Sequence, residues 1–318
     1  MCEFRVRTDL ALEAKESFED DNVEIRGVRI DENYDNEHEI TITKVVIETK
    51  NGAKAMGKPM GTYITLEAPN MAVPDEGYHR EISRVLAEYV KELLGKMPKE
   101  FSVLIAGLGN REVTPDSLGP LVVGNLLINR HVVKEYGKYA MGKERINAIS
   151  GIVPGVMAQT GMETAEIIRG VIEETNPDLL IVVDALAARS TKRLSRTIQI
   201  TDTGINPGSG VGNHRNAINE ESMGIPVISI GVPTVVDAAV IVNDAMENML
   251  HAMSDSNSLK DMAAAFSTFK VSEKHELFRE LLSPQLNTMF VTPKDIDETM
   301  KRLSFTISEA LNMVFQTA

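Results

Sequence analysis

Two aspartates stand where an α/β protein can carry out acid–base chemistry. Asp116 and Asp184 follow short apolar runs, residues 102–107 and 179–183, that the sequence predicts as buried parallel strands. The carboxyl ends of such strands meet at one edge of a sheet, where ligands bind, so two carboxylates there can face one substrate. Two carboxylates that share a site resist joint ionisation, and one can then serve as an acid while the other serves as a base.

A structural role explains the same positions. Asp116 precedes a predicted helix that it can cap, and Asp184 can end its strand in the same way. Asp202 and Asp237 also follow strand-like segments. Spacing alone therefore leaves four candidate aspartates and does not choose the working pair.

The glycine-rich segments do not complete a nucleotide-binding motif. Gly107-Leu108-Gly109-Asn110 begins like a dinucleotide fingerprint, but Glu112 occupies the third glycine position, and its charge would repel a pyrophosphate. A second cluster lacks the lysine and the serine or threonine of a P-loop. It fits an active-site loop or a plain turn, and its candidate residues are Gly208, Ser209, Gly210 and Gly212.

His214 follows this second cluster, beside Arg215. An imidazole there can ligate a metal or orient a substrate carboxylate, and it can equally be a solvated loop side chain. No Gly-x-Ser-x-Gly elbow and no zincin histidine pair occurs in the chain, which disfavours serine hydrolase and zincin chemistry.

Composition excludes several other classes of protein. The formal net charge of -13 disfavours a nucleic-acid binder, because such proteins neutralise phosphates with lysine and arginine. The single cysteine, Cys2, leaves no internal disulfide and no multi-cysteine metal site. No apolar run reaches the length of a membrane span and no secretory signal is visible, so we expect a cytoplasmic protein.

The sequence predicts two structural regions. Residues 40–48 and 62–67 alternate like strands, with a turn signal at Asn51-Gly52 between them, and they indicate a β-rich amino-terminal appendage. The periodicity then changes to that of helices, and residues 78–94 predict the first long one.

Beyond that point strands and helices alternate, which predicts an α/β fold: a mainly parallel twisted sheet with helices on both faces. The carboxyl-terminal helix carries an apolar stripe that we interpret as packing, formed by Ile296, Met300, Leu303, Ile307, Leu311 and Val314.

Six segments together resemble the spore germination proteases, endopeptidases that degrade small acid-soluble spore proteins. The similarity runs through nearly the whole chain, and the segments are Arg7–Ala11, Gly107–Asn110, Thr114–Pro120, Asp184–Arg189, Pro207–Asn213 and Gly231–Ala238.

The resemblance implies an atypical aspartic-type peptidase with an α/β core like that of the hydrogenase maturation endopeptidases. By motif, the two essential aspartates of the family fall on Asp116 and Asp184. It further implies a homotetramer and a place in the cytoplasm of the forespore and spore core, with small acid-soluble spore proteins as the partners. We expect no cofactor and no metal, and from the composition no direct contact with nucleic acid or membrane.

The family enzymes are zymogens that remove a short amino-terminal segment. Their substrates are cut after Glu in sites of the type Thr-Glu-Phe-Ala-Ser-Glu, and Thr8-Asp9-Leu10-Ala11-Leu12-Glu13 is similar to such a site. We therefore expect self-cleavage between Asp9 and Leu10. The implied division is a pro-segment at residues 1–9, a β-rich appendage at 10–75 and an α/β catalytic domain at 76–318.

In the mechanism that follows, one aspartate is ionised and positions a water molecule, while the other is protonated and donates its proton. Backbone amides of residues 208–213 can stabilise the oxyanion. Two alternatives remain: a metal-dependent peptidase in which Asp116, Asp184 and His214 hold an ion, and a non-catalytic protein that binds spore proteins without cutting them.

Overall fold

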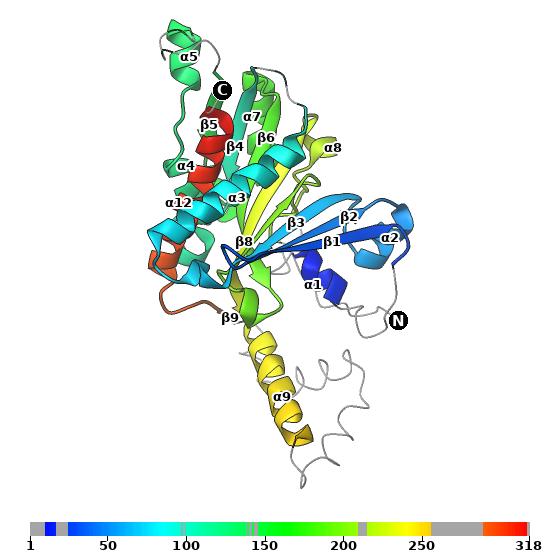
Figure 1. Ribbon diagram of the computed structural model, residues 1–318. Coiled ribbons are helices and arrows are strands. Elements are labelled where there is room, and N and C mark those ends of the chain that lie inside the picture. Colours follow the sequence, from blue (N-terminus) through cyan, green and yellow to red (C-terminus); the bar gives the residue numbers. More distant parts are fainter. Residues whose placement is uncertain are drawn as a thin grey trace.

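The computed structural model describes residues 10–16, 25–96, 98, 100–137, 139, 142, 146–208, 215–255 and 289–316 (Figure 1). The predicted pro-segment lies outside these residues, and so do Ser209, Gly210, Gly212 and His214.

Within the described residues, nine strands form one mixed sheet in the order β1-β2-β3-β7-β8-β6-β4-β5, and β9 pairs with β8. The strands are β1 (Val28–Asp35), β2 (Ile40–Ile47), β3 (Gly61–Glu67), β4 (Ser102–Gly107), β5 (Ala148–Ile152), β6 (Leu179–Ala188), β7 (Thr197–Thr201), β8 (Val227–Asp237) and β9 (Phe290–Val291).

The half of the sheet that contains β4 and β6 is parallel. Strands β8, β6, β4 and β5 lie side by side in the same direction, which confirms the predicted α/β sheet. The chain passes from β4 to β5 on one side and then returns to β6 on the other side of β4. The crevice at the carboxyl ends of β4 and β6 is therefore a topological switch point, the place where open α/β sheets bind ligands.

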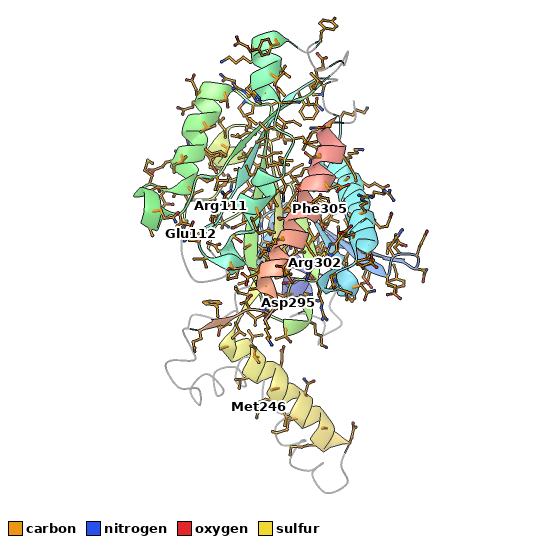
Figure 2. The ribbon with its side chains drawn as sticks, turned by 90° about the vertical axis from the view of Figure 1, so that its left-hand side faces the viewer. Arg111, Glu112, Met246, Asp295, Arg302 and Phe305 are labelled. Atoms are coloured by element: carbon orange, nitrogen blue, oxygen red, sulfur yellow. The ribbon has the colours of Figure 1, made fainter. Side chains whose placement is uncertain are left out.

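Helices cover both faces of the sheet, as predicted (Figure 1). α3 (Glu76–Leu94), α4 (Leu118–Gly124) and α12 (Ile296–Gln316) pack on one face, and α7 (Thr164–Thr175) and α8 (Glu220–Met223) pack on the other. The other described helical segments are α1 (Ala11–Glu16), α2 (Lys50–Met56), α5 (Arg130–Tyr136), α6 (Met157–Thr160), α9 (Ala238–Ser254) and the short 3-10 turns η2 (Pro69–Ala72), η3 (Thr114–Asp116) and η5 (Thr191–Arg193). Helix α9, which carries Met246, extends away from the sheet (Figure 2).

The apolar stripe of α12 packs as predicted. All six of its residues are buried in the core shared with α3 and the sheet. Phe305 lies on the other side of the same helix and is 49% exposed (Figure 2). The periodicity of the sequence thus identifies the buried face of this helix correctly.

The turn predicted at Asn51-Gly52 is wrong, because both residues lie in α2. The Thr49 side chain caps this helix and accepts a hydrogen bond from Gly52 N at 3.1 Å. A Cβ at Gly52 would lie 2.8 Å from the carbonyl oxygen of Gly27. Glycine is required at this position because α2 packs closely on the turn that contains Gly27, and not because the chain turns at Asn51-Gly52.

Strand β6 is longer than the apolar run that predicts it. It continues to Ala188, so Asp184 lies inside the strand and does not end it. Strand β8 likewise continues beyond residue 231 to Asp237.

The β-rich amino-terminal part continues the same sheet, because β3 pairs with β7 in antiparallel fashion. The division into residues 10–75 and 76–318 stays a prediction. In the part of the chain that the structure describes, no helix is both long and apolar enough to cross a membrane.

Candidate functional site

A cavity of about 340 Å³ lies at the switch point, and Asp116 and Asp184 both line it. We call it the aspartate cavity. Asp202 and Asp237, the other two candidates, do not line it. The fold therefore brings together the two aspartates that the family resemblance selects, although they are far apart in the sequence.

Three glycines, Gly107, Gly109 and Gly119, allow the segments around this cavity to approach closely, and a Cβ at Gly107 would lie 2.1 Å from the Gly119 carbonyl oxygen. Gly119, in α4, lies where a Cβ would come within 2.4 Å of the Leu108 carbonyl oxygen and 2.5 Å of the Val183 carbonyl oxygen. Gly109 has a φ of +105°, and a Cβ there would lie 2.0 Å from the Asp116 carbonyl oxygen. The glycines of the apparent dinucleotide fingerprint thus hold η3 and α4 against the ends of β4 and β6.

Asp116 is the last residue of η3, and the loop that follows β4 binds its side chain. Its Oδ2 accepts a hydrogen bond from Asn110 N at 2.8 Å. It does not cap α4, whose N-cap residue is Ser117. Burial raises the pKa of the Asp116 carboxyl above its ordinary value, while the Asn110 amide and the positive charge of Arg215 act in the opposite direction. Asp116 is therefore harder to ionise than an ordinary aspartate.

Asp184 is 6% exposed. It lies in β6 opposite Gly231 of β8, and its Oδ1 accepts a hydrogen bond from Ala185 N at 2.9 Å. A Cβ at Gly231 would come within 2.5 Å of the Leu186 side chain, so a larger residue here would require that side chain to shift. Because Gly231 has no side chain, no side chain projects from β8 at the position paired with Asp184.

Among the described residues, the remaining lining of the aspartate cavity combines one cation with the polar side chains of Thr164, Asn206 and Thr234 and with apolar surface. Arg215 and Gly208 line it, together with Val113, Val156, Val235 and Phe290. Sequence reasoning noted Arg215 as the neighbour of His214 but gave it no role. The sequence feature that could have identified Arg215 is its position at the end of the glycine-rich segment, which also contributes Gly208 to the cavity.

The loop after β4 also contains Arg111 and Glu112, which Figure 2 shows on the surface of this part of the molecule. Neither lines the cavity. Among the described residues, no group of three or more His, Cys, Asp or Glu side chains is placed to hold a metal ion.

Leu10, which follows the predicted cleavage bond, is fully buried. The next residue, Ala11, donates a hydrogen bond from its backbone N to Gln199 Oε1 at 2.6 Å. Gln199 pairs with Gly231, which pairs with Asp184, so the three residues form one row across β7, β8 and β6. Gln199, whose side chain binds the segment after the predicted bond, thus lies two strands away from Asp184, about 10 Å between the two backbones.

The family comparison matches most of the chain. Residues 6–270 match the family model described as germination protease. Proteins named germination protease are similar over 98% of this chain: one from Caldanaerobacter subterraneus subsp. tengcongensis is 46% identical over 94% of its own length, one from Clostridium perfringens is 44% identical over 96%, and one from Bacillus cytotoxicus is 39% identical over 94%.

Among solved structures, a NiFe hydrogenase maturation protease, HycI from Thermococcus kodakarensis, aligns with 72% of this chain and 99% of its own. The sequence identity is 19% and the TM-score is 0.32, too low to bear on the arrangement or chemistry of the site.

Proposed function

Because the chain belongs to the germination protease family and is therefore a peptidase, we propose that it is the aspartate-dependent endopeptidase that starts the degradation of small acid-soluble spore proteins during germination. The observation that carries the proposal is the meeting of Asp116 and Asp184 in one cavity at the switch point.

In the proposed reaction, one aspartate takes a proton from a water molecule whose oxygen attacks the peptide carbonyl carbon. The other aspartate gives its proton to the leaving nitrogen as the C–N bond breaks, and the products are a carboxylic acid and an amine. The raised pKa of Asp116 suits its carboxyl to the protonated role in this pair. The backbone of Gly208 lines the same cavity and is a donor candidate for the oxyanion.

The proposed cut follows an acidic residue. Arg215 supports this specificity, because it places a positive charge in the cavity beside the two aspartates. A guanidinium binds a carboxylate through charge-assisted hydrogen bonds. The side chain before the cut bond, Glu in a spore protein or Asp9 in this chain, is the partner that fits.

We also propose that the chain is a zymogen that cuts its own Asp9–Leu10 bond. The support is the position of Leu10 and Ala11, which are bound in the row that leads to Asp184. A covalently attached segment is present at a high effective concentration, so self-cleavage needs only weak binding. The family resemblance further supports a homotetramer in the spore cytoplasm, which sedimentation analysis of the purified protein tests.

The decisive experiment compares the wild-type chain and the Asp184→Asn variant, both made to start at Leu10 so that neither needs self-cleavage. Each is incubated with a peptide containing Thr-Glu-Phe-Ala-Ser-Glu, with and without a chelator, and the products are identified by mass spectrometry. We expect a cut after the first Glu by the wild type in both conditions and a rate at least about a hundredfold lower for the variant.

Each alternative gives a different result. Loss of cutting in the presence of chelator, with recovery when metal is restored, would support the metal-dependent peptidase. Binding of the peptide without any cut would support the non-catalytic binder. Near-normal turnover by Asp184→Asn would exclude the proposed aspartate pair.

A further inference from the structure

The side chain of Glu13 is buried in a site built from one segment of the chain that lies far from it in sequence. Arg189 N donates hydrogen bonds to both Oε1 and Oε2 of Glu13 at 3.0 Å. The Arg193 guanidinium lies 3.6 Å from Oε1, measured from Nη1, and the Glu13 side chain is 2% exposed. We call the Arg189 amide and the Arg193 side chain the Glu13-binding site.

The backbone ahead of Glu13 is held as well. Gln199 accepts the Ala11 N–H at 2.6 Å, and Leu10 and Ala11 are fully buried. Gln199 and Gly231 line a second cavity, which shares Leu186 and Asn206 with the aspartate cavity. The two cavities therefore adjoin each other, and Gln199 lies along the line that leads to Asp184.

We propose that Gln199 and the Glu13-binding site are substrate subsites for the residues on the carboxyl-terminal side of the cut bond. The inference rests on the proposed self-cleavage between Asp9 and Leu10, because that bond makes Leu10, Ala11, Leu12 and Glu13 the first four residues after the cut. Gln199 then binds the backbone of the second residue, and the Arg189 amide and Arg193 bind the carboxylate of the fourth.

The substrate class follows from these contacts. It is a protein segment with a free backbone N–H at the second residue and an acidic side chain at the fourth residue after the cut bond. A charge that is removed from water needs fixed donors, and a backbone amide together with a guanidinium supplies them for a carboxylate but not for an amide side chain of the same shape.

The segment from Leu10 to Glu13 then has opposite effects on self-cleavage and on the cleavage of other proteins. During self-cleavage Glu13 is the substrate side chain, so its contacts help the reaction. After self-cleavage the same residues stay attached to the enzyme and compete with an incoming protein for the same subsites. A purely structural ion pair would have only one effect, because its loss would weaken the enzyme in both reactions.

The first measurement follows self-cleavage of the full chain by intact mass. Glu13→Gln and Arg193→Gln should each slow it about tenfold or more, and Arg193→Lys should recover part of the rate. Arg84→Gln is the matched control: Arg84 pairs with Glu81 on the exposed side of α3 and contacts no residue of the Glu13-binding site, so this variant should keep a rate close to that of the wild type.

The second measurement uses chains that have completed self-cleavage and two peptides that differ only in Glu or Gln at the fourth position after the cut. The wild type should show a kcat/KM about tenfold or more higher for the Glu peptide, mainly through KM, and Arg193→Gln should lose this preference. Glu13→Gln should cut the Glu peptide faster than the wild type does, because its own segment competes less well.

The outcomes separate the two proposals. If the wild type cuts neither itself nor the peptides, the proposed function fails and the subsites fall with it. If the wild type cuts both peptides equally, or if Glu13→Gln slows both reactions, the function stands and the subsites are refuted.

Discussion

The Asp116 carboxyl group is harder to ionise in the folded chain than in the unfolded chain. Burial is the largest cause of its raised pKa, and the Asn110 amide and Arg215 offset burial only in part. Asp116 therefore binds its proton more tightly when the chain is folded. The resulting stability is fully present below the unfolded pKa, near 3.8, and is lost as the pH rises through the raised folded value.

We expect Asp116→Asn to be more stable than the wild type near neutral pH, because an amide in this place carries no charge to desolvate. The gain in melting temperature should shrink as the pH falls through the raised folded pKa and should be lost below the unfolded value near 3.8, where the wild-type carboxyl is protonated in both states. Thermal unfolding of both proteins across this range measures the effect. A gain that is the same at every pH would show that ionisation of Asp116 is not its cause.

Arg215 should decide the preference for an acidic residue before the cut bond. In Arg215→Gln the kcat/KM for a peptide cut after Glu should fall about tenfold or more, whereas a peptide with Gln at that position should be affected much less. Peptide cleavage by the variant and the wild type checks this.

Arg111→Gln is the matched control for Arg215. Arg111 belongs to the loop before η3, donates to the Pro120 carbonyl oxygen at 3.3 Å and does not line the aspartate cavity. If both variants lose the same preference, the general charge of this region is responsible and Arg215 has no special role.

At the scale of elements, the site depends on how closely α4 approaches β4 and β6. Gly119→Ala should lower the free energy of unfolding by about 1–3 kcal/mol, since the new methyl group meets backbone atoms that cannot rotate away. Activity should fall with it, because η3 and Asp116 directly precede this helix. Denaturant unfolding and peptide cleavage measure the two effects.

Gly170→Ala provides the comparison for this change. Gly170 is exposed in α7, and a Cβ there would have no neighbour within 4 Å. Because alanine favours helices over glycine, this variant should be stabilised by up to about 1 kcal/mol. Equal destabilisation of the two variants would contradict the packing argument for Gly119.

The sequence predicts the periodic elements well. The apolar stripe of α12 and the helix at 78–94 follow from local patterns, because burial of one face imposes a period that composition reveals. The Asn51-Gly52 turn fails for the opposite reason: the role of Gly52 is set by contact with Gly27, and no local pattern records such a contact. Strand β1, with its mostly exposed face, shows no comparable signal.

The candidate site is only partly predictable. Sequence spacing leaves four aspartates open, and the resemblance to a family selects Asp116 and Asp184. Gln199 and Arg193 have no motif at all. Each gains its role from a partner more than 170 positions away in the sequence. Gln199 binds Ala11, 188 residues away, and Arg193 pairs with Glu13. Only the folded chain places such residues together.

At the scale of the whole molecule, α12 packs the carboxyl-terminal part of the chain against α3 and η3, which lie far from it in the sequence. It packs on α3, where Thr306 Oγ1 lies 2.8 Å from His79 Nδ1, and Asp297 accepts a hydrogen bond from Thr114 of η3 at 3.0 Å. This helix lies beyond residue 270, where the match to the family model ends. The aspartate cavity is nonetheless supported by it.

Leu303→Ala tests this support. Leu303 is fully buried, so the cavity left behind should cost about 2–5 kcal/mol of unfolding free energy. Phe305→Ala, on the exposed side of the same helix, should change it by about 0.5 kcal/mol or less. Chemical denaturation of both variants measures the difference, and similar losses would mean that α12 stabilises the fold without a specific buried face.

The burial of Leu10 and Ala11 within their own chain also has a kinetic consequence. If the chain cuts its own Asp9–Leu10 bond while Leu10 and Ala11 are held at Gln199, processing is a first-order event, and its half-time does not change on dilution. Each molecule then matures on its own schedule, without meeting another copy. A germinating cell could obtain its active enzyme at the same pace whether it holds many copies or few.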